Sequence, residues 1–253
     1  MKFKKILGID IGGSGIKGAI VNTKNGKFVK KRYRILTPNP ATPQALADVL
    51  KELVDHFQWD GPIGCGFPAV VLNGVIKTAS NIDKSWIGVN ADKLFSQVTG
   101  LPVMVFNDAD VAGLADVKFG AGKGVKGSIL MLTIGTGIGS AFFTHGKLLQ
   151  NTELGHLIFK DDIAEKYTSD ATRKREKLSW EDWGKRFNEY LQEMERLFWP
   201  ELIIIGGGIS KKMEKFSQTL TVKTKVVPAE LLNNAGIIGA ALAIKANRKL
   251  FEN

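Results

Sequence analysis

Residues 5–22 read KILGIDIGGSGIKGAIVN, and residues 128–144 read SILMLTIGTGIGSAFFT. Each stretch holds two apolar runs on either side of a short glycine-rich segment. This pattern predicts two β-strands joined by a tight turn, because glycine tolerates backbone conformations that other residues avoid. Since the same design occurs twice, we expect two weakly similar α/β halves.

Apolar spacing predicts the elements between and after these hairpins. The Asn25-Gly26 pair is typical of a second hairpin turn, which would lead into a third antiparallel strand over residues 28–36. Residues 42–57 begin with Thr-Pro and repeat apolar side chains at helical spacing, which predicts an amphipathic helix. Further strands are expected within 62–76, 101–106 and 201–205, and further helices over 108–120, within 160–199 and over 235–250.

The composition is that of a chain able to fold around a hydrophobic core. Of its 253 residues, 44% are hydrophobic and 24% are charged. The one cysteine, Cys65, excludes an intrachain disulfide and a multi-cysteine zinc site, which fits a reducing compartment. Asp10 interrupts the apolar stretch near the N-terminus, and no run reaches the roughly 20 apolar residues of a membrane-spanning helix. We therefore expect a cytoplasmic protein without a membrane partner.

The formal net charge of +10 is distributed unevenly along the chain. Residues 1–37 carry +9 and residues 211–253 carry +5, whereas residues 38–210 carry −4. One interpretation is a solvated basic surface that only aids solubility. The other is a polyanionic ligand or substrate, and the charge pattern alone leaves both open.

Two common nucleotide-binding patterns do not account for the glycines. Residues 13–18 and 122–127 both match G-x-G-x-x-G, yet the first stretch leads into a strand and the second precedes one. A dinucleotide-binding fingerprint must instead open a helix after a strand. The P-loop pattern G-x-x-x-x-G-K-[ST] does not occur in the sequence. Any phosphate group must therefore be held in another way.

The two glycine turns themselves suit phosphate. Small residues let successive backbone N–H groups point into one concavity, and hydroxyl groups add further donors. Asp10 beside the first turn is expected to hold Mg²⁺ through water, since this ion keeps much of its hydration shell. Capping of the hairpin turn is the alternative role for Asp10. The candidate phosphate-binding residues of these segments are Asp10, Gly12, Gly13, Ser14, Gly15, Lys17, Thr133, Gly135, Thr136 and Gly137.

Six short motifs occur in the order and at roughly the spacing found in one known family. They read LGIDIGGSGIKGAI (7–20), FPAVVLNGVIKTASNI (67–82), VFNDAD (105–110), LTIGTGIGSA (132–141), ELGH (153–156) and IIIGGGIS (203–210). Together they resemble the ROK family of sugar kinases and repressors, over nearly the whole chain. Within that family the chain is most similar to the polyphosphate glucokinases, because residues 164–184 stand where other members carry a cysteine-rich zinc loop.

The resemblance implies an α/β fold of two actin-like ATPase (ribonuclease H-like) domains with an active cleft between them. The smaller N-terminal domain is expected to comprise residues 1–107 and a returning C-terminal helix within 236–253. Residues 108–235 would form the larger domain. Mg²⁺ as cofactor and a homodimer are further expectations.

Asp108 is the candidate catalytic base. It follows the apolar strand 101–106, so its side chain can emerge at a domain edge. Phosphoryl transfer needs a carboxylate that accepts the proton of the attacking hydroxyl. The resemblance gives the matching aspartate that role, and the alternative is that Asp108 caps the helix that follows.

The resemblance also implies which residues contact the sugar. Glu153 and His156 match positions that hydrogen-bond sugar hydroxyls, and Glu165 has the spacing of another sugar-contacting glutamate. Asn107 is a further candidate, and Asn81 is one for which a turn role is equally open. In zinc-bearing relatives the histidine binds metal together with three cysteines, so we expect no zinc in this chain.

Two further segments resemble parts of a phosphate-donor site. Gly207 and Gly208 follow a buried strand and match a family segment that lies near the nucleotide base and phosphates. The basic run RKREK at residues 173–177 is interpreted as a solvated helix face, with a polyphosphate track as the alternative.

The resemblance implies transfer of a phosphoryl group to the 6-hydroxyl of glucose from inorganic polyphosphate and/or ATP, as a step of glycolysis. The basic chain ends would share one side of the cleft and bind polyphosphate. An ATP-dependent kinase for fructose, mannose or an N-acetylhexosamine is the alternative. A sugar-sensing repressor is disfavoured, because such members carry a helix-turn-helix ahead of the first glycine hairpin and only seven residues precede Gly8. No nucleic acid partner is expected.

Overall fold

The computed structural model of the protein describes residues 4–247 and contains two compact α/β units. The first unit is formed by the chain up to Ala115 together with the chain from Asn234 onward, and the second by Asp116–Asn233. The sequence placed the boundaries before residues 108 and 236. The first boundary instead falls inside helix α3 (Asp108–Phe119), which runs from one unit into the other.

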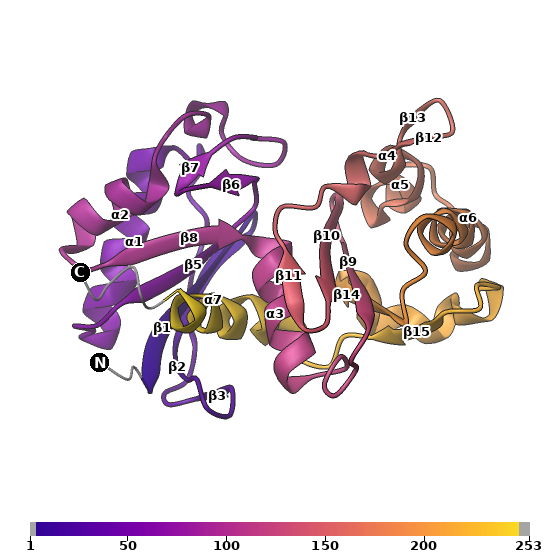
Figure 1. The fold of residues 1–253 in the computed structure, drawn as a ribbon. Coiled ribbons are helices and arrows are strands. Elements are labelled where there is room, and N and C mark those ends of the chain that lie inside the picture. The colour runs from indigo at the N-terminus through magenta and orange to yellow at the C-terminus, as the bar shows by residue number, and fades with distance from the viewer. Residues whose placement is uncertain (1–3, 248–253) are drawn as a thin grey trace. The chain divides into compact units, whose positions relative to one another are not determined.

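A six-stranded sheet forms the centre of the first unit (Figure 1). The predicted first hairpin is present as β1 (Lys5–Gly12) and β2 (Gly15–Asn22), which pair antiparallel along their full lengths. On the other side of β1, β5 (Ile63–Phe67) and β8 (Val103–Asn107) are added in parallel. Parallel strands end at the same edge, so Asp10 on β1 and Asn107 on β8 both lie toward the carboxyl edge of this sheet.

The predicted third strand over 28–36 is wrong in one respect, because it is split. It consists of β3 (Lys27–Phe28) and β4 (Tyr33–Ile35), and both pair antiparallel with β2. The exposed residues 29–32 interrupt the ladder, and three of them are consecutive cations. Three adjacent cations cannot alternate between a buried and a solvated face, so the strand breaks there.

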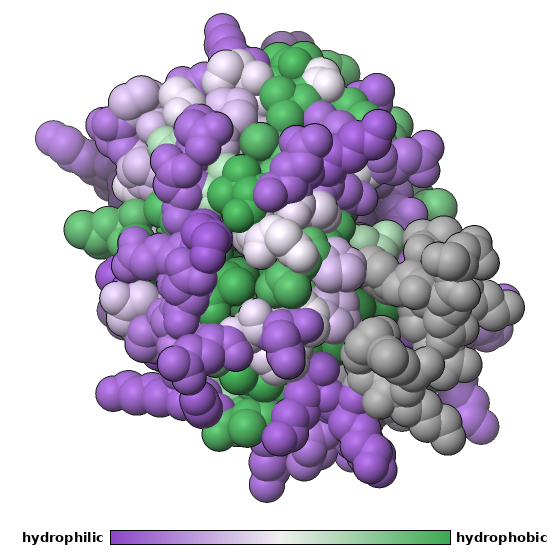
Figure 2. Space-filling view, turned by 90° about the vertical axis from the view of Figure 1, so that its left-hand side faces the viewer, coloured by the Kyte–Doolittle hydropathy of each residue, from purple (hydrophilic) through white to green (hydrophobic). Residues whose placement is uncertain are grey.

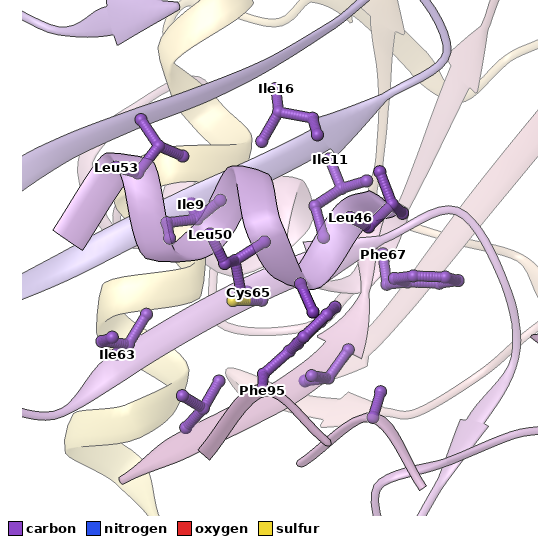
Figure 3. Packing of buried hydrophobic residues seen from close by; sticks show 14 of the residues in the cluster. Ile9, Ile11, Ile16, Leu46, Leu50, Leu53, Ile63, Cys65, Phe67 and Phe95 are labelled. Carbon is purple, nitrogen blue, oxygen red and sulfur yellow. The ribbon is translucent and has the colours of Figure 1, made fainter. Parts of the chain in front are cut away.

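Helix α1 (Pro43–Phe57) confirms the predicted amphipathic helix, with the Thr42 hydroxyl accepting the backbone N–H of Ala45 at its start. Its apolar face packs on the sheet together with α2 (Ala91–Thr99). Figure 3 shows side chains from β1, β2, β5, α1 and α2 meeting in this core, with the Cys65 sulfur among them. The single cysteine is thus a buried, free core residue.

Helix α7 (Ala235–Ala246) is apolar on all sides and packs against β1 and β5 of the first unit. Gly8 and Gly64 allow this close approach, since a Cβ atom at either position would overlap the backbone of α7. The expected closing helix extended to residue 250, and its last part lies outside the described residues.

The second unit has a five-stranded sheet that starts from the second predicted hairpin. β9 (Ser128–Ile134) and β10 (Ile138–Thr144) pair antiparallel, and β11 (Lys147–Leu149) extends that side. β14 (Leu202–Gly207) and β15 (Lys225–Pro228) are added in parallel on the other side. Both sheets therefore combine a glycine hairpin with parallel strands added beside its first strand.

The polar region 160–199 is helical only in part. It begins in a small hairpin, β12 (Ile158–Phe159) and β13 (Asp162–Ile163), and continues as three separate helices. Serine side chains at positions 169 and 179 cap two of them and thereby divide the predicted helical region. The three helices are α4 (Ala164–Thr168), α5 (Asp170–Arg175) and α6 (Trp180–Phe198).

The remaining elements are short. In the first unit they are β6 (Val71–Leu72), β7 (Val75–Ile76) and the 3₁₀ helix η1 (Lys84–Trp86). In the second unit they are the 3₁₀ helices η2 (Leu154–His156), η3 (Gly208–Lys215) and η4 (Ser217–Thr219), and η5 (Leu232–Asn234) precedes α7.

The surface in view in Figure 2 carries many hydrophilic side chains, with apolar ones between them. This agrees with a solvated surface for a chain that holds 35 lysine and arginine residues. Across residues 4–247, none of the helices combines the length and the apolar character needed to cross a lipid bilayer.

Candidate active site

The first glycine turn, Gly12–Gly15, is held by two side chains that follow β3. Arg34 Nη2 donates to the carbonyl oxygen of Ser14 at 2.7 Å, and the Thr37 hydroxyl donates to the carbonyl oxygen of Gly12 at 2.5 Å. Gly15 has no room for a Cβ atom, because the Arg34 guanidinium occupies that space. Gly13 is exposed, with nothing near its missing Cβ, so the tip of the turn is open to a ligand.

A pocket of about 480 Å³ lies beside this turn within the first unit. Gly12, Gly13, Thr37 and Asn81 are among its lining residues. The structure therefore brings the candidate sugar contact Asn81 to the same pocket as the first phosphate-binding candidate. A pocket of this volume is in the usual range for small-molecule sites.

Asp10 lies next to Lys17, whose Nζ is 3.3 Å from its carboxylate. Burial raises the pKa of Asp10, and the charges of Lys17 and Arg32 oppose that rise. Gly236 at the start of α7 must be glycine here, because a Cβ atom would press on this carboxylate. Asp10 is thus held in a positive environment by neighbouring strands and a helix start. Its carboxylate accepts a hydrogen bond from the Lys17 side chain, whereas the turn-capping alternative would require one from the backbone of the turn.

The surroundings of Asp10 limit how it could hold Mg²⁺. One carboxylate oxygen already faces Lys17, and within residues 4–247 no group of three or more His, Cys, Asp or Glu side chains is arranged around a common metal position. A single carboxylate suits a hydrated Mg²⁺ bound through water and does not suit a fully dehydrated ion.

Asn107 and Asp108 stand where β8 passes into α3. The Asn107 side chain caps the helix, accepting the N–H of Asp110 at 3.0 Å and donating to the carbonyl of Ala69 at 3.1 Å. Asp108 is the first helical residue, is partly exposed and accepts the N–H of Ala109 at 2.8 Å. The cap that was the alternative role for Asp108 is therefore supplied by Asn107.

The second glycine turn, Gly135–Gly137, lies in the second unit beside the last glycine run. The N–H of Gly135 donates to the carbonyl of Gly137 at 3.0 Å and closes the turn. The parallel register of β9 and β14 sets Gly206 opposite Thr133 and Gly207 opposite Ile134. Two glycine segments that are distant in sequence therefore meet at one edge of this sheet.

The three sugar-contact candidates of the second unit form a cluster. His156 Nδ1 lies 3.0 Å from Glu153 Oε2, and His156 Nε2 lies 3.6 Å from Glu165 Oε1. Burial raises the pKa of Glu153, and His156 opposes that rise. The other oxygen of Glu165 accepts the backbone N–H of Ile138 at 3.1 Å. Two carboxylates around one imidazole provide acceptors suited to vicinal hydroxyl groups.

The basic run 173–177 is largely neutralised by acids of its own neighbourhood. Arg173 and Lys174 both pair with Asp170, at 2.9 Å and 2.6 Å, and Arg175 pairs with Glu176 at 3.1 Å. Arg173 also lies over the Trp180 ring, 4.1 Å from its centroid. These contacts support the interpretation as a solvated helix face.

The other basic segment, residues 211–253, is divided between the units. We expected it to lie beside the basic N-terminal segment, but five of its lysines belong to the second unit, because the chain returns to the first only at Asn234. Lys211, Lys212 and Lys215 lie on η3, which begins at Gly208, and they form no ion pair with any residue that the structure describes.

Sequence reasoning missed Arg34 and Thr37 and the contact between Glu165 and the second turn. Arg34 lay in a basic run interpreted only by its charge, and Thr37 in a segment interpreted as proline punctuation. Gly15 and Gly137 were the signals in the sequence that could have indicated these contacts. Each glycine leaves space that a side chain from elsewhere in its unit occupies.

Comparison with known proteins adds independent information. The sequence profile of the ROK family matches residues 6–168. Polyphosphate glucokinase from Mycobacterium tuberculosis is 46% identical over 241 residues, which cover 95% of this chain and 91% of that protein. The crystal structure of inorganic polyphosphate/ATP-glucomannokinase from Arthrobacter sp. strain KM is 45% identical, with a TM-score of 0.92, and covers 96% of this chain and 99% of that one.

A more distant structure shares the fold alone. The ROK family glucokinase from Streptomyces griseus, solved with glucose and AMPPNP, is 23% identical, with a TM-score of 0.80 over 94% of this chain and 98% of that one. The glycine turns, the Asn107-Asp108 helix start, Glu153 and His156 lie in the six motifs that carry the resemblance, and Glu165 lies in the segment 164–184. With a profile match over more than half of its length and near-complete alignment to a 46% identical relative, this chain belongs to the ROK family.

Proposed function

We propose that this protein phosphorylates the 6-hydroxyl of glucose, with inorganic polyphosphate and/or ATP as phosphoryl donor. The observation that carries the proposal is the 46% identity to a polyphosphate glucokinase across 95% of the chain. The site chemistry supports it, because each unit presents open glycine turns suited to phosphate and polar side chains suited to a sugar.

In this proposal, Asp108 is the catalytic base. Its position at the first turn of α3 leaves the carboxylate partly exposed, while the Asn107 cap and the bond to Ala109 hold its backbone and side chain. Asp108 accepts the proton of the 6-hydroxyl as the oxygen attacks the terminal phosphorus. Catalysis otherwise consists of positioning and charge neutralisation.

The sugar is held by the cluster Glu153, His156 and Glu165, with Asn81 and Asn107 as further contacts. A site built around hydroxyl partners discriminates against sugars that lack those hydroxyls, because its buried polar groups would then be unpaired.

The donor phosphates are bound by the two glycine turns and by Gly207 and Gly208. Asp10 would hold Mg²⁺ through water, and the ion would supply positive charge to the phosphate oxygens during transfer. Lys17, which contacts Asp10, keeps a second positive charge beside the first turn. Lysines of η3 would extend the positive surface beyond Gly208.

Coupled assays for sugar 6-phosphate test the proposal. Glucose should be phosphorylated with long-chain polyphosphate, ATP or both, and fructose and N-acetylhexosamines should be poor substrates. Failure with glucose and both donors in the presence of Mg²⁺ would refute it. Activity with ATP alone would leave an ordinary ATP glucokinase with a basic surface.

Mannose is the second candidate sugar, and one observation favours it. The Arthrobacter relative, 45% identical, is described as a glucomannokinase. Comparison of kcat/KM for glucose and mannose distinguishes a site specific for glucose from one that accepts both sugars.

Two further proposals concern the state of the protein. We propose a homodimer, which light scattering coupled to size-exclusion chromatography tests directly. We also propose that the purified protein holds no stoichiometric zinc, since Cys65 is buried in the core of the first unit. Elemental analysis that finds one zinc ion per chain would overturn the second proposal.

A further inference from the structure

We infer that Glu165 is a positioning residue for the phosphoryl donor, because its carboxylate ties the sugar cluster to the second glycine turn. The inference rests on the proposed function, from which it takes the sugar contact of Glu165. It adds that the binding of sugar and the binding of donor are coupled through this one side chain.

The two oxygens of Glu165 face different parts of the site. Oε2 accepts the backbone N–H of Ile138, the first residue after the second glycine turn, at 3.1 Å. Oε1 lies 3.6 Å from His156 Nε2. One carboxylate therefore contacts both the exit of the phosphate turn and the imidazole of the sugar cluster.

Gly137 leaves the space that the Glu165 carboxylate occupies beside the second turn. A Cβ atom at position 137 would overlap Glu165 Oε2, and the φ angle of Gly137 is not in the left-handed region. The backbone conformation would therefore accept alanine, and the space taken by the carboxylate is what excludes it. Glycine at position 137 is therefore needed to leave space for the Glu165 carboxylate, in addition to any contact that the turn makes with phosphate.

The segment that carries Glu165 also holds the entrance of the turn. The N–H of Ala171 donates to the carbonyl of Gly135 at 3.2 Å, and the N–H of Ser169 donates to the carbonyl of Glu165 at 3.0 Å. The short helices α4 and α5 thus contact both ends of the second turn. Figure 1 shows these helices beside the ends of β9 and β10.

These contacts give the coupling a physical route. A sugar hydroxyl that donates to Glu165 orients the carboxylate, and the bond to Ile138 then depends on whether sugar is bound. Because linkage is reciprocal, a donor that needs the turn in its bonded form must tighten sugar binding by the same factor. If Glu165 were only a sugar contact, donor binding would not depend on it.

Two substitutions at one position separate these roles. Glu165→Gln keeps an oxygen that can accept the Ile138 N–H but loses the charge that binds sugar, whereas Glu165→Ala loses both. We expect both variants to weaken glucose binding, measured by calorimetry without donor, by about tenfold. At saturating glucose, only Glu165→Ala should raise the KM for the donor, by about tenfold, while Glu165→Gln stays within about threefold of wild type.

Gly137→Ala tests the contact between Glu165 and the second turn by a change in the turn itself. The added methyl group displaces the Glu165 carboxylate, so glucose affinity measured without donor should fall by about fivefold or more. Gly135→Ala is the comparison variant, since it adds the same methyl group to the same turn in open space. Whatever it does to the donor KM, its glucose affinity should stay within about twofold of wild type.

The outcomes distinguish the inference from the function on which it rests. Equal donor KM values for Glu165→Ala and Glu165→Gln, or an unchanged glucose affinity in Gly137→Ala, would overturn the coupling and leave the kinase intact. Unchanged glucose affinity in both Glu165 variants would remove Glu165 from the sugar site and overturn the coupling with it. The Gly137→Ala arm keeps the test decisive if Glu165→Ala does not fold.

Discussion

The two glycine turns share one design but are supported in opposite ways. The first turn is held by Arg34 and Thr37, which donate to its carbonyl groups from the neighbouring β4 strand and the segment after it. The second is held by Glu165, which accepts a backbone N–H at its exit and belongs to the sugar cluster. The first turn is thus held by a cation from its own unit, and the second by an anion that also contacts His156.

This difference suggests a division of labour between the turns. A cation beside the first turn adds to phosphate affinity whether or not sugar is present. An acid beside the second turn would repel phosphate unless something else engages it, so its support is conditional. The following variants and conditions test that contrast.

Asp108→Asn should have the largest effect of the variants, and the quantity that it lowers is kcat. Because Asp108 belongs to neither turn, this variant is the reference for those that change one turn. Loss of the proton acceptor is expected to lower kcat by about 10²–10⁴-fold. The amide keeps an acceptor for the Ala109 N–H, so glucose affinity should stay within about threefold. Steady-state kinetics and calorimetry measure the two quantities, and a kcat within about tenfold of wild type would exclude Asp108 as the base.

Ionic strength should separate the donors at the first turn. If polyphosphate extends beyond the turn, as the proposed function requires, it would meet Lys17, Arg32 and Arg34, and its binding would release counterions. We expect its KM to rise by about tenfold between roughly 50 and 200 mM salt, and the KM of ATP to rise less. Initial rates with each donor at saturating glucose provide the measurement. Equal salt dependence for both donors would assign the basic surface to solubility alone.

Arg34→Met should weaken the first turn without affecting sugar. The variant keeps an unbranched apolar stem but loses the bond to the Ser14 carbonyl, so the donor KM should rise by about three- to tenfold. Glucose affinity without donor should be unchanged, in contrast to the Glu165 variants. Arg34→Lys, the control, keeps the charge but not the planar guanidinium, and a full recovery by lysine would show that charge alone matters. A loss of glucose affinity in Arg34→Met would erase the distinction between the turns.

The smallest effect concerns the stability of the first unit. Asp92 accepts the Val105 N–H at 2.7 Å, and burial raises its pKa to about 6. The folded protein therefore binds a proton at the Asp92 carboxylate more tightly than the unfolded chain does. Stability is highest when Asp92 is protonated and falls as pH rises from about 4 to about 6.

Asp92→Asn removes that charge and keeps an oxygen for Val105. At pH 8 it should raise stability by about 1 kcal/mol, a value reduced because the carboxylate is only partly buried, and raise Tm by about 2–4 °C. At pH 4 the variant and wild type should unfold at nearly the same temperature. Asp55→Asn on the exposed side of α1 is the control, and a pH-independent gain at position 92 would contradict the titration argument.

Much of the fold followed from the sequence because local patterns and tertiary structure agree. The two glycine hairpins, the Thr42-capped helix and the strand-to-helix step at Asn107-Asp108 were all predicted from short-range signals. The third strand was not, since three consecutive cations break it without any glycine or proline to mark the break. The division of residues 160–199 was not predicted either, although Ser169 and Ser179, which cap α5 and α6, are of a residue type that favours helix starts.

The site was predictable only as a list of residues. The Asn107 side chain that caps α3 is oriented by the carbonyl group of Ala69, 38 residues earlier. The brace on each turn comes from a segment 20 or more residues away, and nothing local to the turn specifies it. Contacts of this kind arise from tertiary packing, and only the vacant Cβ positions at Gly15 and Gly137 hinted at them.

The apolar helix α7 has a consequence for how the protein is made. The second unit is one continuous segment, so all of its residues are synthesised before the chain returns to the first unit. The first unit is discontinuous, and its surface around Gly8 and Gly64 stays uncovered until residues 235–246 have been synthesised. During that interval its exposed β1 and β5 surface is a natural target for chaperones. A translation pause at any point before residues 235–246 emerge should therefore prolong this exposure and increase aggregation of nascent chains.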